Sequence, residues 1–437
     1  MLFQRKPIEI PEAHRLNFLH LYLDIGWFGL LNGSAMAFIS IYLVRIGATA
    51  FEIGLLSAAP ALTAIGLALP AGRWLSGRAV DRAVFRTSVY HRFFYLVWVP
   101  LPVLFFEDSQ VVVVVIIAVT FLMSIPGTFL AVGFNAVFAD AVPPEWRGHV
   151  AGIRNAVLAV VTIVTSLLCG YILDNTPFPQ NYQLVFALGF LGALMSSYHL
   201  YRIRLTRVER ANTGRTLGDL AQPGVLRTVG DAVRTGVAWR YFTRIRSFRL
   251  PGLKILRGAY GGVLLSLFLF HLTQHLAIPL FPIYWVEQLS LTDQAISLGN
   301  ALFYGSVFLG STQIRWLTDR LGSRGITAAG ALLMSAYPGL TAITNDVPLY
   351  LVTSVVGGAA WSLAGGALSN YLLEQIPEDD RPVHLAWYML VANLAVLGGS
   401  LLGPLLARSI GLVPALVFIA VGRVLSAFGI WRIGRPH

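Results

Sequence analysis

Long apolar stretches follow one another along this chain of 437 residues, and they constrain its fold more than any other feature. Most of them approach or exceed the roughly 20 apolar residues that cross a bilayer core. Six precede an arginine-rich interval, at about 16–44, 51–75, 89–106, 110–139, 150–173 and 182–203. Six follow it, at about 257–286, 292–317, 325–344, 347–375, 383–407 and 411–431. The sequence therefore predicts an all-α polytopic membrane protein with twelve transmembrane helices.

Composition agrees with this prediction and argues against a water-soluble enzyme. Only 12% of the residues are charged and 56% are hydrophobic, whereas soluble proteins carry about a quarter charged residues. The single cysteine, Cys169, lies in an apolar stretch, so neither a disulfide framework nor a cysteine-rich zinc site is expected. No cofactor or metal is predicted.

Basic residues are placed very unevenly around the apolar stretches. If the N-terminus is cytoplasmic, all of the 32 lysines and arginines except Arg45 and Arg408 fall on the cytoplasmic side. The acidic residues Glu52, Glu107, Asp108, Asp174, Glu287, Asp293 and Asp346 cluster on the other side. The positive-inside rule then places both termini in the cytoplasm and the chain in the plasma membrane. The formal net charge of +11 is explained by the bilayer, without nucleic acid.

The same pattern divides the chain into segments. We expect a cytoplasmic tail at 1–15, two bundles at 16–203 and 257–433, and a short tail at 434–437. Between the bundles, 204–256 forms a basic cytoplasmic segment with valines at four-residue spacing among arginines. This spacing predicts an amphipathic helix on the inner leaflet, and a role in tethering is favoured over a ligand site.

The two predicted bundles repeat one another in sequence. Ile41, Tyr42 and Val44 recur 242 positions later as Ile283, Tyr284 and Val286, and Arg73-Trp74-Leu75 recurs at the same offset as Arg315-Trp316-Leu317. The segments 142–147 and 376–381 also match. Two such six-helix halves enclose a site at their interface in transporters.

The loop after the eighth apolar stretch carries Leu317, Asp319, Arg320, Gly322 and Arg324. This spacing resembles the loop G-x-L-x-D-R-x-G-R-R of the major facilitator superfamily, with Arg315 in place of the first glycine. The corresponding loop of the first half keeps Leu75 and Arg78 but has Gly77 where an acidic residue is expected. The resemblance covers about 16–433 and implies two pseudo-symmetric six-helix bundles that alternate access to a central site.

The resemblance also implies a cytoplasmic gate, in which acidic helix ends pair with loop arginines. In the second half it assigns Asp319, Arg320, Gly322, Arg324 and Glu374, and in the first half Arg78, Arg82 and Asp140. Arg147 and Arg381 follow the helices that end near Asp140 and Glu374. The alternative is that these groups only anchor the chain at the inner surface.

Asp24 lies at membrane depth in the first stretch, where an ionisable group is costly unless it faces a cavity or a partner. Burial favours the protonated form of a carboxyl group, so Asp24 is the leading candidate for proton coupling. His20, one helical turn earlier, is its predicted partner. A purely structural pair remains the alternative.

The seventh stretch presents a second polar face. His271, Gln274 and His275 share one side of a helix, and Pro279 and Pro282 predict a kink beyond them. The two histidines are further proton-coupling candidates, although a structural role or a weak metal signal also fits them. Gln274 matches Asn32 in the repeat, and both are predicted substrate contacts. The remaining cavity candidates are Asn135, Asn155, Asn300, Trp361, Asn370, Trp387 and Asn393. For Arg154, pairing with Asp140 is favoured over a role in binding an anionic substrate.

Energy from ATP is excluded, because the two lysines, Lys6 and Lys254, lie in no P-loop sequence. We therefore predict a secondary active transporter for a small solute, monomeric and coupled to protons, with sodium as the alternative ion. A cavity rich in aromatics and poor in charge favours a neutral or amphipathic substrate. A passive uniporter and a non-transporting receptor or scaffold remain the competing functions.

Overall fold

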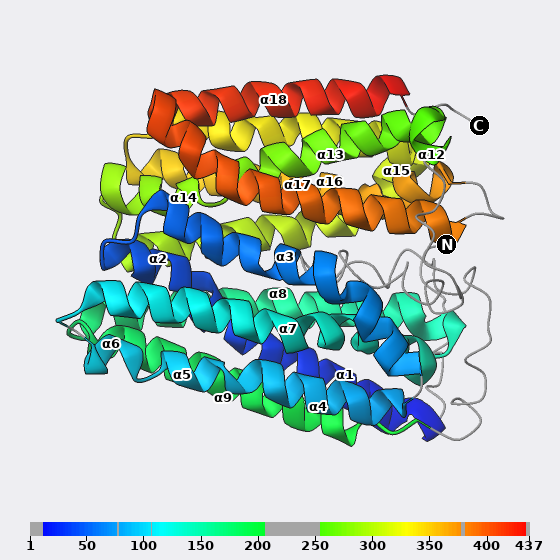
Figure 1. Cartoon of the computed structure of the whole chain (residues 1–437), viewed down its shortest axis with the longest axis horizontal. Helices are drawn as coiled ribbons and strands as arrows, with labels where there is room; N and C mark the ends of the chain where they lie inside the picture. The colour runs from blue at the N-terminus through cyan, green and yellow to red at the C-terminus, as the bar shows by residue number, and fades with distance from the viewer. Residues whose placement is uncertain (1–11, 77, 106, 206–253, 377–380, 434–437) are drawn as a thin grey trace, which may run out of the picture.

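The computed structural model describes residues 12–76, 78–105, 107–205, 254–376 and 381–433. Within these ranges the chain is almost entirely helical and contains no strand. The long helices run along one direction of the molecule (Figure 1). Ten helical stretches among the described residues are long and apolar enough to cross a membrane. The predicted all-α membrane fold is therefore confirmed.

The N-terminal half comprises the helices drawn from blue to green in Figure 1. Its first pass, His14–Arg45, is continuous but contains a wider π-helical turn. The elements are α1 (Glu12–Leu31), η1 (Asn32–Met36), α2 (Ala37–Arg45), α3 (Ala50–Ser76), α4 (Val80–Phe93), α5 (Tyr95–Trp98), α6 (Leu101–Leu104), α7 (Ser109–Ala141), α8 (Pro144–Asn175) and α9 (Gln180–Arg202).

The C-terminal half runs from green to red in Figure 1. The predicted break at Pro279 and Pro282 is confirmed, since α13 ends before these prolines and a short helix and a π-helical turn follow. The elements are α12 (Lys254–Arg257), α13 (Ala259–Ala277), α14 (Leu280–Ile283), η4 (Tyr284–Gln288), α15 (Asp293–Ile343), α16 (Val347–Glu374), α17 (Arg381–Ile410) and α18 (Leu412–Ile433).

Two passes differ from a single straight helix. The third pass is divided into α4, α5 and α6, none of which is long enough alone to cross a bilayer. Conversely, the 51 residues of α15 contain two passes that meet at Gly322. Gly322 has φ 68° and ψ 162°, a conformation open to glycine, so the chain reverses there without a loop. Adding the divided third pass and counting α15 as two passes raises the ten helical stretches to twelve passes among the described residues.

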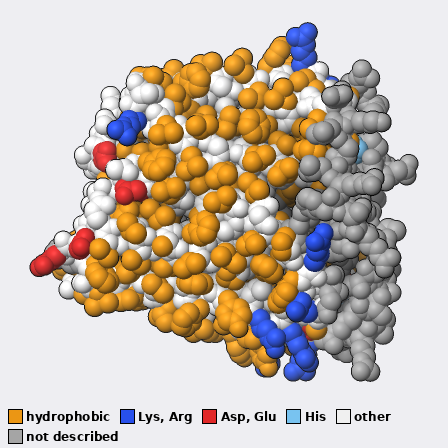
Figure 2. All heavy atoms as spheres, in the orientation of Figure 1, with side chains coloured by type: hydrophobic (Ala, Val, Ile, Leu, Met, Phe, Trp, Pro, Cys, Tyr) orange, Lys and Arg blue, Asp and Glu red, His pale blue; other side chains and the backbone are white. Residues whose placement is uncertain are grey.

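The two ends of the helices differ in charge. Figure 2 shows acidic side chains at the left end, basic side chains toward the right end, and hydrophobic side chains over the surface between them. We call these the acidic end and the basic end. Several helices begin at the acidic end with an oxygen-bearing cap, since Asp108, Thr292 and Asp346 accept hydrogen bonds from the backbone N–H groups of Val111, Ala295 and Leu349. Capping thus adds to the charge asymmetry.

The halves contact each other mainly through two pairs of helices, α3 with α17 and α8 with α15, and α2 also contacts α14 and η4. Gly54 of α3 lies directly against the carbonyl of Ser400 in α17, where a side chain has no room. Gly170 of α8 approaches Ser297 of α15 in the same way. These glycines let the halves meet closely.

The amphipathic helix predicted within 204–256 falls almost entirely on 206–253, which lie outside the described residues. The predicted tails lie outside them as well, except for residues 12–15.

Candidate functional site

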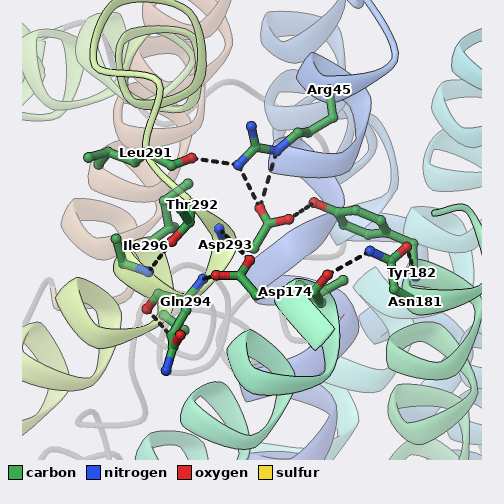
Figure 3. A network of polar contacts seen from close by, with 12 residues as sticks. Arg45, Asp174, Asn181, Tyr182, Leu291, Thr292, Asp293, Gln294 and Ile296 are labelled. Atoms are coloured by element: carbon green, nitrogen blue, oxygen red, sulfur yellow. Dashed lines mark hydrogen bonds and ion pairs between the residues drawn. The ribbon is translucent and has the colours of Figure 1, made fainter. Parts of the chain in front are cut away.

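A network of polar contacts joins the two halves at the acidic end (Figure 3). Arg45, the last residue of α2, donates to the carboxylate of Asp293 at 3.0 Å and to the carbonyl of Leu291 at 2.6 Å. The hydroxyl of Tyr182 in α9 donates to the other oxygen of Asp293 at 2.9 Å. Two side chains, one from α2 and one from α9, thus converge on the start of α15.

Asp174, at the end of α8, completes this network. Its carboxylate accepts from the backbone N–H of Asp293 at 3.1 Å and from that of Gln294 at 3.3 Å. A carboxylate at a helix N-terminus is favourable, because the first N–H groups have no partner within the helix. We call Arg45, Asp174, Tyr182 and Asp293 the acidic-end network.

A second polar cluster lies deep inside the N-terminal half. Asp24 is buried and pairs with Arg154 of α8 at 3.2 Å and with Arg92 of α4 at 3.8 Å. Ser196 of α9 donates a hydrogen bond to the same carboxylate. At 1.5 Å per residue, Asp24 and Arg154 each lie about 15–18 Å along their helices from the basic end. Two buried arginines therefore share one aspartate near the middle of the membrane.

This cluster corrects two sequence-based predictions. Arg154 pairs with Asp24 rather than with Asp140, because α8 extends ten residues beyond Pro144 before reaching it. His20 is not the partner of Asp24 either. Its Nδ1 lies 3.1 Å from Nδ1 of His199 in α9, which faces the side of α1 that carries His20. Although one helical turn apart, His20 contacts His199 and Asp24 contacts Arg154.

The cluster borders a cavity of about 350 Å³. Asp24, Arg92 and Arg154 line it together with Asn135 and, from the C-terminal half, Asn393. The side-chain nitrogen of Asn393 bonds to the carbonyl of Met389, while its buried Oδ1 has no partner in the described structure. We call this space the N-half cavity.

A further cavity, of about 310 Å³, lies mainly in the C-terminal half. Gln274, Asn300 and Trp361 line it as predicted substrate contacts, and Arg423 of α18 was not predicted. Ala37, Phe38 and Ile41 of α2 close it on the other side. We call this space the C-half cavity.

Asn32 and Asn300 are positioned at the contact between the halves. Asn32 donates to Tyr304 of α15 and to Thr162 of α8, each at 3.3 Å. Asn300 donates to Ser166 of α8 at 3.0 Å. Both predicted amides therefore bridge halves in this structure.

The histidines of the seventh pass are not brought together with Asp24. His271 contacts the hydroxyl of Tyr388 at 3.1 Å, and His275 bonds to the carbonyl of His271 at 2.8 Å. Neither lines the two cavities, and the same is true of Asn155, Asn370 and Trp387. Within the ranges that the structure describes, no group of three or more His, Cys, Asp or Glu is arranged to hold a metal ion.

The predicted gate residues lie toward the basic end. Arg320 stacks over Trp316 at 4.1 Å, and Arg78 over Trp74 at 4.5 Å. Arg147 is buried and donates to the carbonyls of Ala139 and Val142.

Among the second-half gate side chains that are described, no ion pair forms between Asp319, Arg320, Arg324 and Glu374. Arg82 and Asp140 also lie toward this end, whereas the side chain of Arg381 is outside the described part.

Sequence reasoning missed the acidic-end network, Arg92 and Arg423. Arg45 carried a signal, since it was one of two basic residues on the acidic side and Asp174 and Asp293 lay on that side as well. Arg92 and Arg423 gave no comparable signal, because their positions in the sequence suggested inner-surface charges rather than buried ones.

Comparison with known proteins adds to this geometry. The family model described as Major Facilitator Superfamily matches residues 25–262 and 263–437. No curated protein matches the sequence well enough to count as a relative.

Solved structures share the fold at low sequence identity. The nucleoside transporter NupG is 12% identical with a TM-score of 0.63, and the match covers 96% of this chain and 99% of that one. The xylose transporter XylE from E. coli, in a partially occluded inward-open conformation, is 15% identical with a TM-score of 0.65, covering 96% and 100%. A bacterial homologue of the iron transporter ferroportin is 12% identical with a TM-score of 0.58, covering 96% and 99%.

Proposed function

Because the chain belongs to the major facilitator superfamily, we propose that it is a secondary active transporter that moves a small solute by alternating access. The observation that carries this proposal is the asymmetry between the two ends. Polar contacts join the halves at the acidic end, while buried charged groups line cavities between and within the halves. A carrier closed on one side, with polar groups near the midplane, has this arrangement.

In this proposal the basic end faces the cytoplasm of a plasma membrane, with both chain termini on that side. The support is the positive-inside rule, since basic residues outnumber acidic ones and gather at one end. The acidic-end network then acts as the outer gate. The second-half residues Asp319, Arg320, Arg324 and Glu374 form ion pairs when the inner side closes and the outer gate opens.

We further propose that the transport is coupled to protons through Asp24. The carboxylate lies at membrane depth and borders the N-half cavity, where solute and water reach it. A proton on Asp24 removes the single negative charge between Arg92 and Arg154, so the two arginines separate and the helices that carry them shift. His20 and His199 are the nearest further titratable pair on this route.

Proton flux into proteoliposomes tests this coupling. The native chain, Asp24→Asn and Asp24→Glu are challenged with a pooled set of metabolites and amphipathic compounds. We expect solute-dependent proton movement in the native chain and its loss in Asp24→Asn. Equal solute movement without proton movement contradicts the role of Asp24 and favours a passive uniporter or sodium. Absence of all solute movement favours a receptor or scaffold.

Alternating access has a test that needs no substrate. The buried Cys169 is replaced by alanine, and Asn135, which lines the N-half cavity, is replaced by cysteine. A membrane-impermeant maleimide is then applied to vesicles of each orientation. We expect labelling from the basic end that falls when a solute is transported. Labelling that is equal from both sides contradicts the proposal.

A further inference from the structure

Arg423 is a buried cation without a buried anion to match it. It lies in α18, about 15 Å from the basic end of that helix at 1.5 Å per residue, and is only 3% exposed. No acidic side chain in the described residues pairs with it. An unpaired charge at this depth is costly, and in membrane proteins it marks a ligand pathway.

Two backbone carbonyls hold the Arg423 side chain in place. One guanidinium nitrogen donates to the carbonyl of Met334 at 2.6 Å, and the other donates to that of Gln274 at 3.4 Å. The carbonyl of Met334 lacks its usual helical donor, because Pro338 stands four residues later and has no N–H. The carbonyl of Gln274 belongs to the last turn of α13, which ends at Ala277. These carbonyls orient Arg423 without cancelling its charge.

Polar capacity remains unused around this side chain. A guanidinium has five N–H donors, and the Nε of Arg423 has no partner in the described structure. The side-chain Oε1 of Gln274 is likewise buried without a partner. Both residues line the C-half cavity, while these two atoms are themselves buried.

Much of the remaining lining of this cavity is aromatic. Phe281 stacks on Trp285 with ring centroids 6.0 Å apart. The rings of Phe281 and Tyr337 are arranged edge to face, with centroids 4.8 Å apart. Phe303 and Trp361 add to the same lining. Such walls accept the flat or apolar part of a ligand and exclude water, which strengthens any charge interaction inside.

We propose that the C-half cavity binds an amphipathic organic anion, a carboxylate or a similar singly charged oxyanion on an apolar body, with Arg423 holding the charged group. The guanidinium of Arg423 donates hydrogen bonds to the oxyanion, and the side-chain oxygen of Gln274 accepts a hydrogen bond from a hydroxyl or amine group of the ligand. The 310 Å³ of the cavity is at the lower end of small-ligand sites, so the body is small. This proposal names the substrate class of the proposed transporter and rests on that function.

The charges that line the N-half cavity also favour an anionic ligand. In the N-half cavity, Arg92 and Arg154 face Asp24, and Arg423 adds a third arginine at similar depth. Three buried arginines against one aspartate favour an anion over a neutral or cationic solute. The compositional expectation of a charge-poor cavity is therefore replaced by that of an anion site.

Binding to the purified full-length protein tests the proposal. The probes are a panel of aryl and alkyl monocarboxylates, each compared with its neutral amide, and binding is followed by quenching of tryptophan fluorescence. A charged hydrogen bond predicts that the preferred acid binds about tenfold to a hundredfold more tightly than its amide. Arg423→Gln is expected to remove this preference. Arg432→Gln, the same change on the exposed end of α18, is expected to keep it.

The outcomes separate this proposal from the proposed function. If no acid in the panel binds the native protein more tightly than its amide, the anion site is overturned, and this comparison needs no variant. An acid preference that survives in folded Arg423→Gln overturns the role of Arg423. If acids bind through Arg423 but no solute crosses proteoliposomes, the transport function fails while the site stands. If only neutral solutes are transported, the anion site is overturned while the transport function stands.

Discussion

The two halves place buried arginines at the same depth but stabilise them differently. In the N-terminal half, Arg154 and Arg92 lie against the carboxylate of Asp24. In the C-terminal half, the hydrogen-bond partners of Arg423 among the described residues are the carbonyls of Met334 and Gln274. The first cluster is held by opposite charge, and the second by dipoles that a proline and a helix end leave available.

This difference indicates a division of work between the halves. A cluster with an internal counter-charge is held together in the empty protein and responds when that charge changes. A cation held only by carbonyls keeps its attraction for an external anion. We therefore propose that coupling belongs to the N-terminal half and recognition of the anionic group to the C-terminal half.

The largest effect is expected from Asp24→Asn. This change leaves two buried arginines without a counter-charge, which costs about 3–5 kcal/mol of the free energy of unfolding. SDS titration in mixed micelles, followed by tryptophan fluorescence, measures it. The double variant Asp24→Asn/Arg92→Gln removes one of the two charges and is expected to recover part of the loss. A single variant as stable as the native protein contradicts the charge-paired cluster.

Arg154→Gln is expected to have a smaller effect. It leaves Asp24 and Arg92 as a neutral pair, so the loss is that of a charged hydrogen bond, about 1.5–3 kcal/mol. The same titration measures it. A loss larger than that of Asp24→Asn, measured side by side, reverses the assignment of Asp24 as the central charge.

Arg423→Gln sharpens the comparison between the halves. The change sacrifices hydrogen bonds to two carbonyls but also removes the desolvation cost of an unpaired cation, and a glutamine amide still donates. The net change in the free energy of unfolding is expected to stay within about 1 kcal/mol. If Arg423→Gln destabilises the protein as much as Arg154→Gln does, the C-terminal arginine is a structural tie.

The smallest change in stability is expected from Arg45→Gln in the acidic-end network. Arg45 is partly exposed, so its pair with Asp293 contributes about 0–1 kcal/mol. Its effect is conformational instead, because the loss of a contact between the halves favours opening of the acidic end. Maleimide labelling of the Asn135→Cys protein from that end should rise.

Arg408→Gln is the matched control for this labelling experiment. Arg408 is also basic and belongs to the last turn of α17, but it is exposed and donates to no acidic partner in the described residues. Its replacement should leave the labelling unchanged. An equal rise in both variants would show that charge at the acidic end acts generally rather than through the network.

The fold could largely be predicted, because membrane-spanning helices impose a strong pattern of length and charge. The breaks were harder. Pro279 and Pro282 predicted theirs, and the reversal at Gly322 falls within the loop that the sequence predicted between 317 and 325. In the third pass, Pro100 and Pro102 mark the break between α5 and α6, whereas the break between α4 and α5 at Phe94 had no comparable mark in the sequence.

The site was predictable only in part, because partners come from different helices. Asp24 was found from the cost of its burial and Gln274 from its position in the repeat, while Asn300 and Asn393 were named as polar residues within apolar stretches. Arg92 and Arg423 were not, since an arginine near a helix end and one that reaches into a cavity look the same in sequence. Only the rotation and depth of α4 and α18 distinguish them.

The kink at Gly322 joins two passes of α15 that reach the two polar regions described above. Its first arm begins at Asp293 in the acidic-end network, and its second arm carries Met334, whose carbonyl holds Arg423. The arms meet at Gly322, where the backbone leaves the helical conformation. We propose that release of Asp293 shifts the carbonyl that holds Arg423, which links opening of the outer gate to the grip on the anion.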